Sequence, residues 1–314
     1  MLLPATPENV ERSAALLRAG GVVAFPTETV YGLGALAFEP EAVARIFEAK
    51  QRPSFDPLIV HVLDDAMLSR VVAEFPPPAW QLAGLFWPGP LTLVVRKASP
   101  LPGLVTAGLD TVAVRMPSHP IARALLASVG EALAAPSANR FGGLSPTRAE
   151  HVEASLGDRA DVILDGGRSE HGIESTVVAL EPRPALLRPG AIPVEAIESV
   201  IGRLRRDAAF GPVRAPGQLP QHYAPRTPLR IVDPAGVSLQ ARKRAGVLSL
   251  RGSFEGYAAH RMLSRGGDLR EAAARFFEAL YELDRLGLER IDAQPLPEEG
   301  LGLAMMDRLR RASD

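Results

Sequence analysis

The sequence predicts an α/β protein of two domains joined by a proline-rich segment. Its 314 residues exceed what one compact domain usually holds. Short apolar runs of strand length alternate with amphipathic stretches of helix length, as in α/β folds. A proline-rich stretch without periodicity, residues 211–228, interrupts this alternation, which then restarts. We therefore expect a first domain at residues 1–210, a linker at 211–228 and a second domain at 229–314.

The first domain is expected to be mixed α/β. Strands are predicted where short apolar runs end in turn residues, at 21–27, 57–62, 91–96, 112–116, 161–164 and 176–180. Helices are predicted where apolar residues recur every three or four positions, at 40–50, 64–73, 78–86, 120–128 and 194–204. A capping box from Thr147 to Glu150 predicts the start of one more helix.

The second domain repeats the alternation on a smaller scale. Strands are predicted at 229–232, 246–250 and near 290, with a helix between the first two and further helices at 268–286 and 301–311. This order is typical of a small doubly wound, Rossmann-like domain. The proline-rich linker is expected to be extended and semi-rigid, so that it could lie along a surface.

The composition excludes several classes of protein. The chain has no cysteine, which rules out disulfides, thiolate metal sites and a cysteine nucleophile. No apolar stretch approaches the roughly 20 residues that a membrane-spanning helix needs. Glu8 and Glu11 fall in the first dozen residues, where a signal peptide would be apolar. We therefore expect a soluble, cytoplasmic protein with no membrane partner.

The charge distribution argues against a nucleic-acid clamp. Residues 1–210 carry 19 basic and 23 acidic side chains, and residues 211–314 carry 16 and 13. Strong direct binding of nucleic acid is therefore not expected. Only 3 of the 35 basic residues are lysines. Against this arginine-rich background Lys50 is informative, because a compact ammonium can be needed where a planar guanidinium does not fit.

Two cations come together at the end of the helix predicted at 40–50. Lys50 and Arg52 could simply compensate the helix dipole. However, Pro53 and Pro57 make the following loop rigid and hold both cations near Asp56. Rigidly held cations are what a polyphosphate site requires.

Two loops rich in hydroxyl groups and glycine could complete such a site. Residues 26–34 supply Thr27, Thr29 and Tyr31, although an ordinary strand-to-loop turn explains this segment equally well. It has neither the lysine of a P-loop nor a dinucleotide fingerprint. Residues 134–146 supply neutral hydrogen-bonding groups just before a helix N-terminus, which favours an anion: Ser137, Asn139 and Ser145.

Two polar side chains lie inside apolar strands. His61 is either a core histidine or a ligand-binding group, and the sequence leaves both open. Arg115 must pair with a structural acid or face a bound carboxylate or phosphate, because an unpaired buried arginine is costly; we favour the bound anion. No Ser-His-Asp order, HExxH helix or cluster of metal ligands is present, so no fixed metal site is predicted. Cations, hydroxyls and backbone amides together suit phosphoryl or nucleotidyl transfer.

In this order, the segments resemble the threonylcarbamoyl-AMP synthase family, whose core is the YrdC-like domain. The matching stretches span about residues 8–205: FPTETVYGLG, KxRPxxxPLIVHV, WPGPLT, DTVAVRMPxHP, APSANRxGxxSPT, LDGG, GIESTVV and LRPG. The linker ending in residues 222–225 and the extra domain resemble the family's long form. The resemblance implies a fold of α+β character, with a twisted mixed sheet and flanking helices forming a concave, cation-lined cleft.

The resemblance also implies a reaction. L-threonine, bicarbonate or CO₂, and ATP would give threonylcarbamoyl-AMP and pyrophosphate, with Mg²⁺ carried by the ATP. A threonylcarbamoyl-transferase protein would then act on tRNA. Lys50 and Arg52 would neutralise the anions that react.

Family motifs assign the remaining roles by position. Threonine would be held by Thr29, His61, Arg115, the Ala135 backbone and Ser175. The nucleotide would be held by Arg52, Asp56, Thr111, Ser137, Asn139, Ser145 and Arg188, with Tyr223 closing over the site as part of a lid.

The sequence departs from the family at one of these positions and at one position of the linker. Asp56 stands where asparagine is expected, and Gln218 where methionine is. The alternative from another class is a non-catalytic RNA-binding or ribosome-maturation module, against which the negative first domain argues. Carbamoyl transfer in hydrogenase maturation would need zinc fingers, which a chain without cysteine cannot form.

Overall fold

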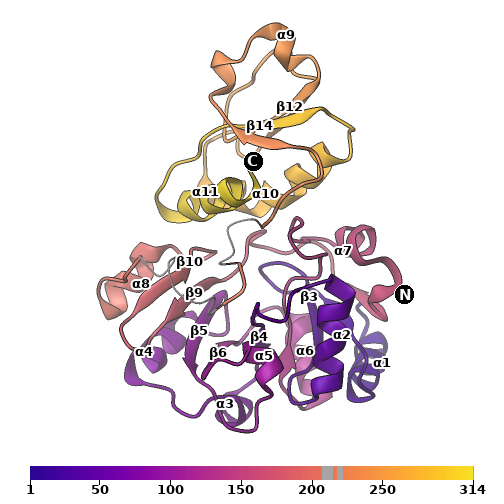
Figure 1. The fold of residues 1–314 in the computed structure, drawn as a ribbon, viewed down its shortest axis with the longest axis vertical. Helices are drawn as coiled ribbons and strands as arrows, with labels where there is room; N and C mark the ends of the chain where they lie inside the picture. The colour runs from indigo at the N-terminus through magenta and orange to yellow at the C-terminus, as the bar shows by residue number, and fades with distance from the viewer. Residues whose placement is uncertain (207–214, 218–221, 314) are drawn as a thin grey trace.

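The structure is a computed structural model that describes residues 1–206, 215–217 and 222–313. Its two sheets lie one above the other in Figure 1, with the large sheet below and the small one above. The linker predicted at 211–228 is thus described only at 215–217 and 222–228. None of the described helices is long and apolar enough to cross a membrane.

The large sheet has ten described strands in the order β1-β8-β2-β3-β7-β4-β6-β5-β9-β10 and mixes parallel with antiparallel pairs. Its strands are β1 (Leu2–Pro4), β2 (Val23–Phe25), β3 (Gly32–Leu36), β4 (Ile59–His61), β5 (Leu91–Arg96), β6 (Thr111–Arg115), β7 (Leu133–Ala134), β8 (Val162–Asp165), β9 (Thr176–Ala179) and β10 (Ala185–Arg188). The mixed sheet with flanking helices confirms the predicted fold class.

Helices cover both faces of this sheet (Figure 1). They are α1 (Pro7–Arg18), α2 (Pro40–Lys50), α3 (Asp65–Val71), α4 (Pro77–Phe86), α5 (Gly103–Thr106), α6 (Pro120–Val129), α7 (Ala149–Leu156), the 3₁₀ turn η1 (Gly157–Arg159) and α8 (Val194–Ile201). Alternate residues of β2, counted with Val22 just before it, belong to two different apolar clusters: Val22 and Ala24 to one, Val23 and Phe25 to the other. The sheet therefore has a core on each face.

The small sheet is parallel throughout, in the order β11-β14-β12-β13. Its elements are β11 (Leu229–Ile231), the 3₁₀ turn η3 (Pro234–Gly236), α9 (Leu239–Arg242), β12 (Ala245–Ser249), β13 (Ala259–Met262), α10 (Leu269–Asp284), β14 (Arg290–Ala293) and α11 (Gly300–Ala312). Figure 1 shows α10 and α11 on the side that faces the large domain. The helix expected between the first two strands is only the four-residue α9.

One local prediction is wrong. The capping box at Thr147 does not form, because α7 begins one residue later, with Arg148 at the N-cap position and no side-chain cap. The Thr147 hydroxyl instead lies 3.3 Å from Nδ1 of His151. The histidine ring, stacked 3.9 Å from Tyr281 of α10, therefore takes the place that the capping glutamate was expected to fill.

The two domains share an apolar core. Val30, Leu144 and Ile173 of the large domain cluster with residues of α10 and α11, and so does Tyr223 of the linker. These large-domain residues lie in loops at the ends of its strands. The second domain therefore sits on the loops from which the sequence predicted a binding site.

Candidate active site

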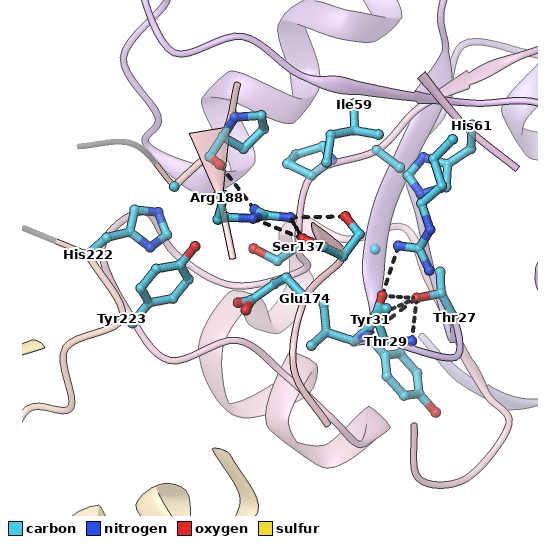
Figure 2. Close-up of a pocket in the computed structure, with 18 of the residues that line it drawn as sticks. Thr27, Thr29, Tyr31, Ile59, His61, Ser137, Glu174, Arg188, His222 and Tyr223 are labelled. Atoms are coloured by element: carbon cyan, nitrogen blue, oxygen red, sulfur yellow. Dashed lines mark hydrogen bonds between the residues drawn. The ribbon is translucent and has the colours of Figure 1, made fainter. Parts of the chain in front are cut away.

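A cavity lies where the loops of the large domain meet the linker. Figure 2 shows His61, Thr27 and Thr29 toward one end of it and Arg188, Glu174, His222 and Tyr223 toward the other. Residues far apart in the sequence reach it because β3, β4, β6 and β7 are close in the sheet. In particular, His61 and Arg115 are register partners on the parallel strands β4 and β6.

Arg115 is tied on three sides at the first end of the cavity. Its Nε donates to the Gly89 carbonyl at 3.2 Å, Nη1 to Thr29 Oγ1 at 2.9 Å and Nη2 to Glu28 Oε1 at 2.5 Å. Burial alone would raise the pKa of Glu28, but the Arg115 guanidinium outweighs it and lowers that pKa to about 2. Arg115 thus pairs with a structural acid, which is the interpretation that we did not favour, and it also lines the cavity, so a bound anion at Arg115 stays a prediction.

His61 is buried beside Arg115 and is uncharged near neutral pH. Burial, helped by the Arg115 charge, lowers the pKa of His61 to about 3. Its Nδ1 has no hydrogen-bond partner among the described residues. A neutral imidazole with a free ring nitrogen can donate to or accept from a small polar ligand.

Two further arginines line the other end. Arg52 donates from Nη2 to the Pro57 carbonyl at 2.8 Å and approaches the Asp56 carboxylate at 2.8 Å. Arg188 donates from Nη1 to the Pro216 carbonyl at 3.1 Å and from Nη2 to the Ser175 carbonyl at 3.0 Å. Burial lowers the pKa of both guanidinium groups. Both guanidinium groups are fixed where an anion would enter, because backbone carbonyls and, for Arg52, the Asp56 carboxylate hold them.

The comparisons with known proteins agree with this geometry. A family described as telomere recombination matches residues 15–190, and one described as threonylcarbamoyl-AMP synthase, C-terminal domain, matches residues 192–314. A threonylcarbamoyl-AMP synthase of Pyrococcus abyssi is 44% identical over 97% of this chain and 94% of its own length. That of Bacillus subtilis is 44% identical over 97% and 93%.

The chain belongs to the threonylcarbamoyl-AMP synthase family. A solved structure described as P. abyssi Sua5 complexed with L-threonine superimposes with a TM-score of 0.91. It is 42% identical and covers 100% of this chain and 96% of its own.

The structure brings most of the predicted site residues of this synthase-family chain to the cavity. The ones that line it are Thr29, Arg52, His61, Arg115, Ala135, Ser137, Ser175, Arg188 and Tyr223. The Ala135 N–H already donates to the Ile59 carbonyl, so only its carbonyl is available to a ligand. The ones that do not line it are Lys50, Asp56, Thr111, Asn139 and Ser145.

Lys50 shows why some predicted residues lie behind the cavity wall. Its side chain is 1% exposed, and Nζ donates to the Ser137 carbonyl at 2.5 Å and to the Asn139 carbonyl. Burial, with the nearby Arg52 charge, holds the pKa of Lys50 well below its usual value. Lys50 is therefore part of the packed interior, where it anchors the loop that carries Ser137.

Sequence reasoning did not single out two acids near the cavity. Glu28 fixes Arg115, and Glu174 lines the cavity beside Arg188. Both stand inside motifs that match the family, FPTETVYGLG and GIESTVV. Their position inside these motifs could have marked them as site residues. Their roles could not be predicted, because the arginines that they pair with are distant in the sequence.

Proposed function

We propose that this chain makes threonylcarbamoyl-AMP and pyrophosphate from L-threonine, bicarbonate or CO₂, and ATP. Relatives that carry this name are 36–44% identical over nearly the whole chain. The observation that carries the proposal is the two-ended cavity. One end offers a fixed guanidinium, a threonine hydroxyl and a neutral imidazole, and the other end offers buried arginines held by carbonyls.

The first end would bind threonine. Three of the five N–H donors of Arg115 are used inside the protein, which leaves two for the amino-acid carboxylate. Thr29, His61, the Ala135 carbonyl and Ser175 would hold the rest of the substrate. Glu28 would keep the guanidinium in place, because a buried ion pair restricts both side chains.

The second end would bind the nucleotide. Arg52, Arg188, Ser137 and Tyr223 line it and would contact phosphates, ribose or base. Asp56 would act through Arg52, and Lys50 and Asn139 through the Ser137 loop.

The chemistry would proceed in two steps. The threonine amine would add to CO₂, or to bicarbonate with loss of water, to give a carbamate. A carbamate oxygen would then attack the α-phosphorus of ATP, and the bond from that phosphorus to the pyrophosphate oxygen would break. Two anions must meet in this step, so Arg52, which lines the cavity, would lower the barrier by neutralising their repulsion.

Mg²⁺ would enter with ATP. No group of three or more acidic or histidine side chains that could hold a metal occurs among residues 1–206, 215–217 and 222–313. Glu174, the carboxylate that lines the cavity, already accepts from Ser145 and Arg308. The residues present therefore fit an ion held by phosphate oxygens and water.

The partners follow from the product. A threonylcarbamoyl adenylate is a hydrolysable mixed anhydride, so His222 and Tyr223 of the linker would shield it from water. A separate transferase would pass the threonylcarbamoyl group to tRNA. The use of ATP and the role in tRNA modification also fit a cytoplasmic location.

Pyrophosphate release tests the proposal. The purified protein is mixed with Mg-ATP and bicarbonate, with L-threonine, L-serine or no amino acid, and the adenylate is identified by mass spectrometry. We expect threonine-dependent release that Arg115→Gln abolishes and that Arg96→Gln, at the exposed end of neighbouring β5, leaves unchanged. Release in no mixture by folded protein would overturn the synthase proposal, and tRNA binding would then favour the RNA-binding alternative.

A further inference from the structure

One side chain of the second domain contacts a residue that lines the cavity. Arg308 lies in α11, 0% exposed, and is the largest fully buried side chain among the described residues. A buried guanidinium is costly unless it is paired. Its contacts therefore indicate what it does.

Arg308 joins three parts of the chain. Its Nε donates to Glu174 Oε2 of the large domain at 3.0 Å, and Nη1 donates to Asp307 Oδ2 at 2.7 Å. Its guanidinium carbon lies 4.9 Å from the ring centroid of Tyr223 in the linker. Burial disfavours the charged form, but Tyr223 and the two carboxylates outweigh it and raise the pKa of Arg308 above its usual value. The group is a permanent cation.

Glu174 is the point where Arg308 acts on the site. This carboxylate is 4% exposed and lines the cavity near Arg188 and Tyr223 (Figure 2). Its Oε1 accepts from the Ser145 hydroxyl, so both oxygens are engaged when Arg308 is in place. An acid at this end of the cavity would otherwise repel a triphosphate and compete for Arg188.

We propose that Arg308 is a positioning residue through which the second domain completes the nucleotide end of the cavity. It neutralises Glu174 and directs the carboxylate away from the phosphates, and its plane supports the Tyr223 ring. This inference rests on the proposed function, because it assumes that the arginine-lined end receives ATP. It gives the second domain a part in substrate binding that acts through Glu174 and Tyr223.

The competing explanation is that Arg308 only holds the two domains together. Glu278 of α10 separates the two explanations, because it accepts from Arg148 at 2.6 Å and approaches Arg168 at 3.5 Å across the same domain boundary. None of these three residues lines the cavity. Glu278→Gln therefore weakens the domain contact without touching Glu174.

Two measurements on the full chain test the proposal. Calorimetry gives the Kd of Mg-ATP, and initial rates give KM for ATP and for L-threonine. Arg308→Met should raise the Kd and KM of ATP at least about tenfold and leave the KM of threonine within about twofold, because it leaves an uncompensated carboxylate at the phosphate end only. Glu278→Gln should change neither constant beyond about twofold.

Removing the carboxylate should rescue the variant. Glu174→Gln combined with Arg308→Met should return the Kd of ATP to within about threefold of the unsubstituted protein. Arg308→Lys should lie between Met and Arg, since lysine keeps the charge but not the planar contact with Tyr223.

The proposal is overturned if Arg308→Met and Glu278→Gln raise the Kd of ATP equally, or if the double variant is no better than Arg308→Met. If Arg308→Met does not fold, the Kd of ATP is compared between Arg308→Lys and Glu174→Gln instead. A loss of ATP affinity in Glu174→Gln as large as that in Arg308→Lys also overturns the proposal. Failure of the proposed function looks different. The unsubstituted chain would then bind ATP but release no pyrophosphate, and the binding comparison would still stand.

Discussion

Gly172→Ala should loosen the packing between the two domains without removing any polar side chain. Gly172 lies in the large domain against α10, with φ at +65°. A Cβ there would lie 2.4 Å from the Ala274 carbonyl oxygen and 2.6 Å from that of Ala273. Helix backbone cannot move aside as a flexible side chain can, so α10 must shift as a unit.

Gly167→Ala is the matched control. Gly167 has φ at +81°, but a Cβ there would meet nothing within 4 Å. Both substitutions carry the strain of a left-handed alanine, about 1–2 kcal/mol. Only Gly172→Ala adds the clash with α10, which costs about 1–3 kcal/mol more, as overpacking does. The difference between the two variants isolates the domain contact.

Urea unfolding followed by circular dichroism measures the loss of stability, and amide hydrogen exchange in α10 shows where it falls. We expect the free energy of unfolding to drop by about 1–3 kcal/mol more for Gly172→Ala than for Gly167→Ala, with faster exchange in α10. Displacement of α11 with α10 should also raise the KM of ATP. Equal losses in the two variants, with unchanged exchange in α10, would refute the domain packing described above.

Three further predictions concern the large domain. Lys50→Met should lower the free energy of unfolding by about 2–4 kcal/mol, because it leaves two buried carbonyls unpaired. In the same urea experiment the control Lys97→Met, which loses one weak hydrogen bond of 3.3 Å, should lower it by under about 1 kcal/mol. Arg115→Lys should raise the KM of threonine at least about tenfold and that of ATP far less in steady-state rates, since lysine cannot bond Glu28, Thr29 and a carboxylate together. The unfolded chain binds a proton at His61 near pH 6.5 and the folded chain only near pH 3, so the free energy of unfolding should fall as the pH falls through this range. In urea unfolding at several pH values, His61→Gln should reduce the slope of this free energy against pH by up to about 1.4 kcal/mol per pH unit.

The sequence was most informative where local and tertiary signals agree. The helix α2 was predicted with its observed bounds, because Pro40 opens it and Gln51 closes it in a left-handed conformation at φ 52°. The strand β5 was predicted with its observed bounds from a run of buried branched residues. By contrast, β3 was placed in a loop, because Gly32 and Gly34 have low strand propensity. Pairing with β2 and β7 overrides that propensity.

The sequence predicted which segments form the site, but it did not predict the ion pairs that hold them together. The segments adjoin neighbouring central strands of the sheet, among them β3, β7, β4 and β6, so the motifs converge whatever their spacing in the sequence. The ion pairs that fix them join residues 87 positions apart for Arg115 and Glu28, and 134 apart for Arg308 and Glu174. Nothing in the sequence near Arg308 distinguishes it from the other arginines of α11, since its role depends on how the domains dock.

The arrangement of partners also explains how buried cations can remain useful to a substrate. The described groups that accept from Lys50 and Arg188 are uncharged: backbone carbonyls and, for Arg188, the Ser175 hydroxyl as well. For Arg188, which lines the cavity, such partners satisfy the donors without cancelling the charge, so its positive potential persists there. Arg115 and Arg308 are instead paired with Glu28 and Glu174. Since an acid partner fixes a guanidinium and offsets part of its charge, these two pairs suit orientation, whereas Arg188, held by uncharged groups, suits the neutralisation of phosphates.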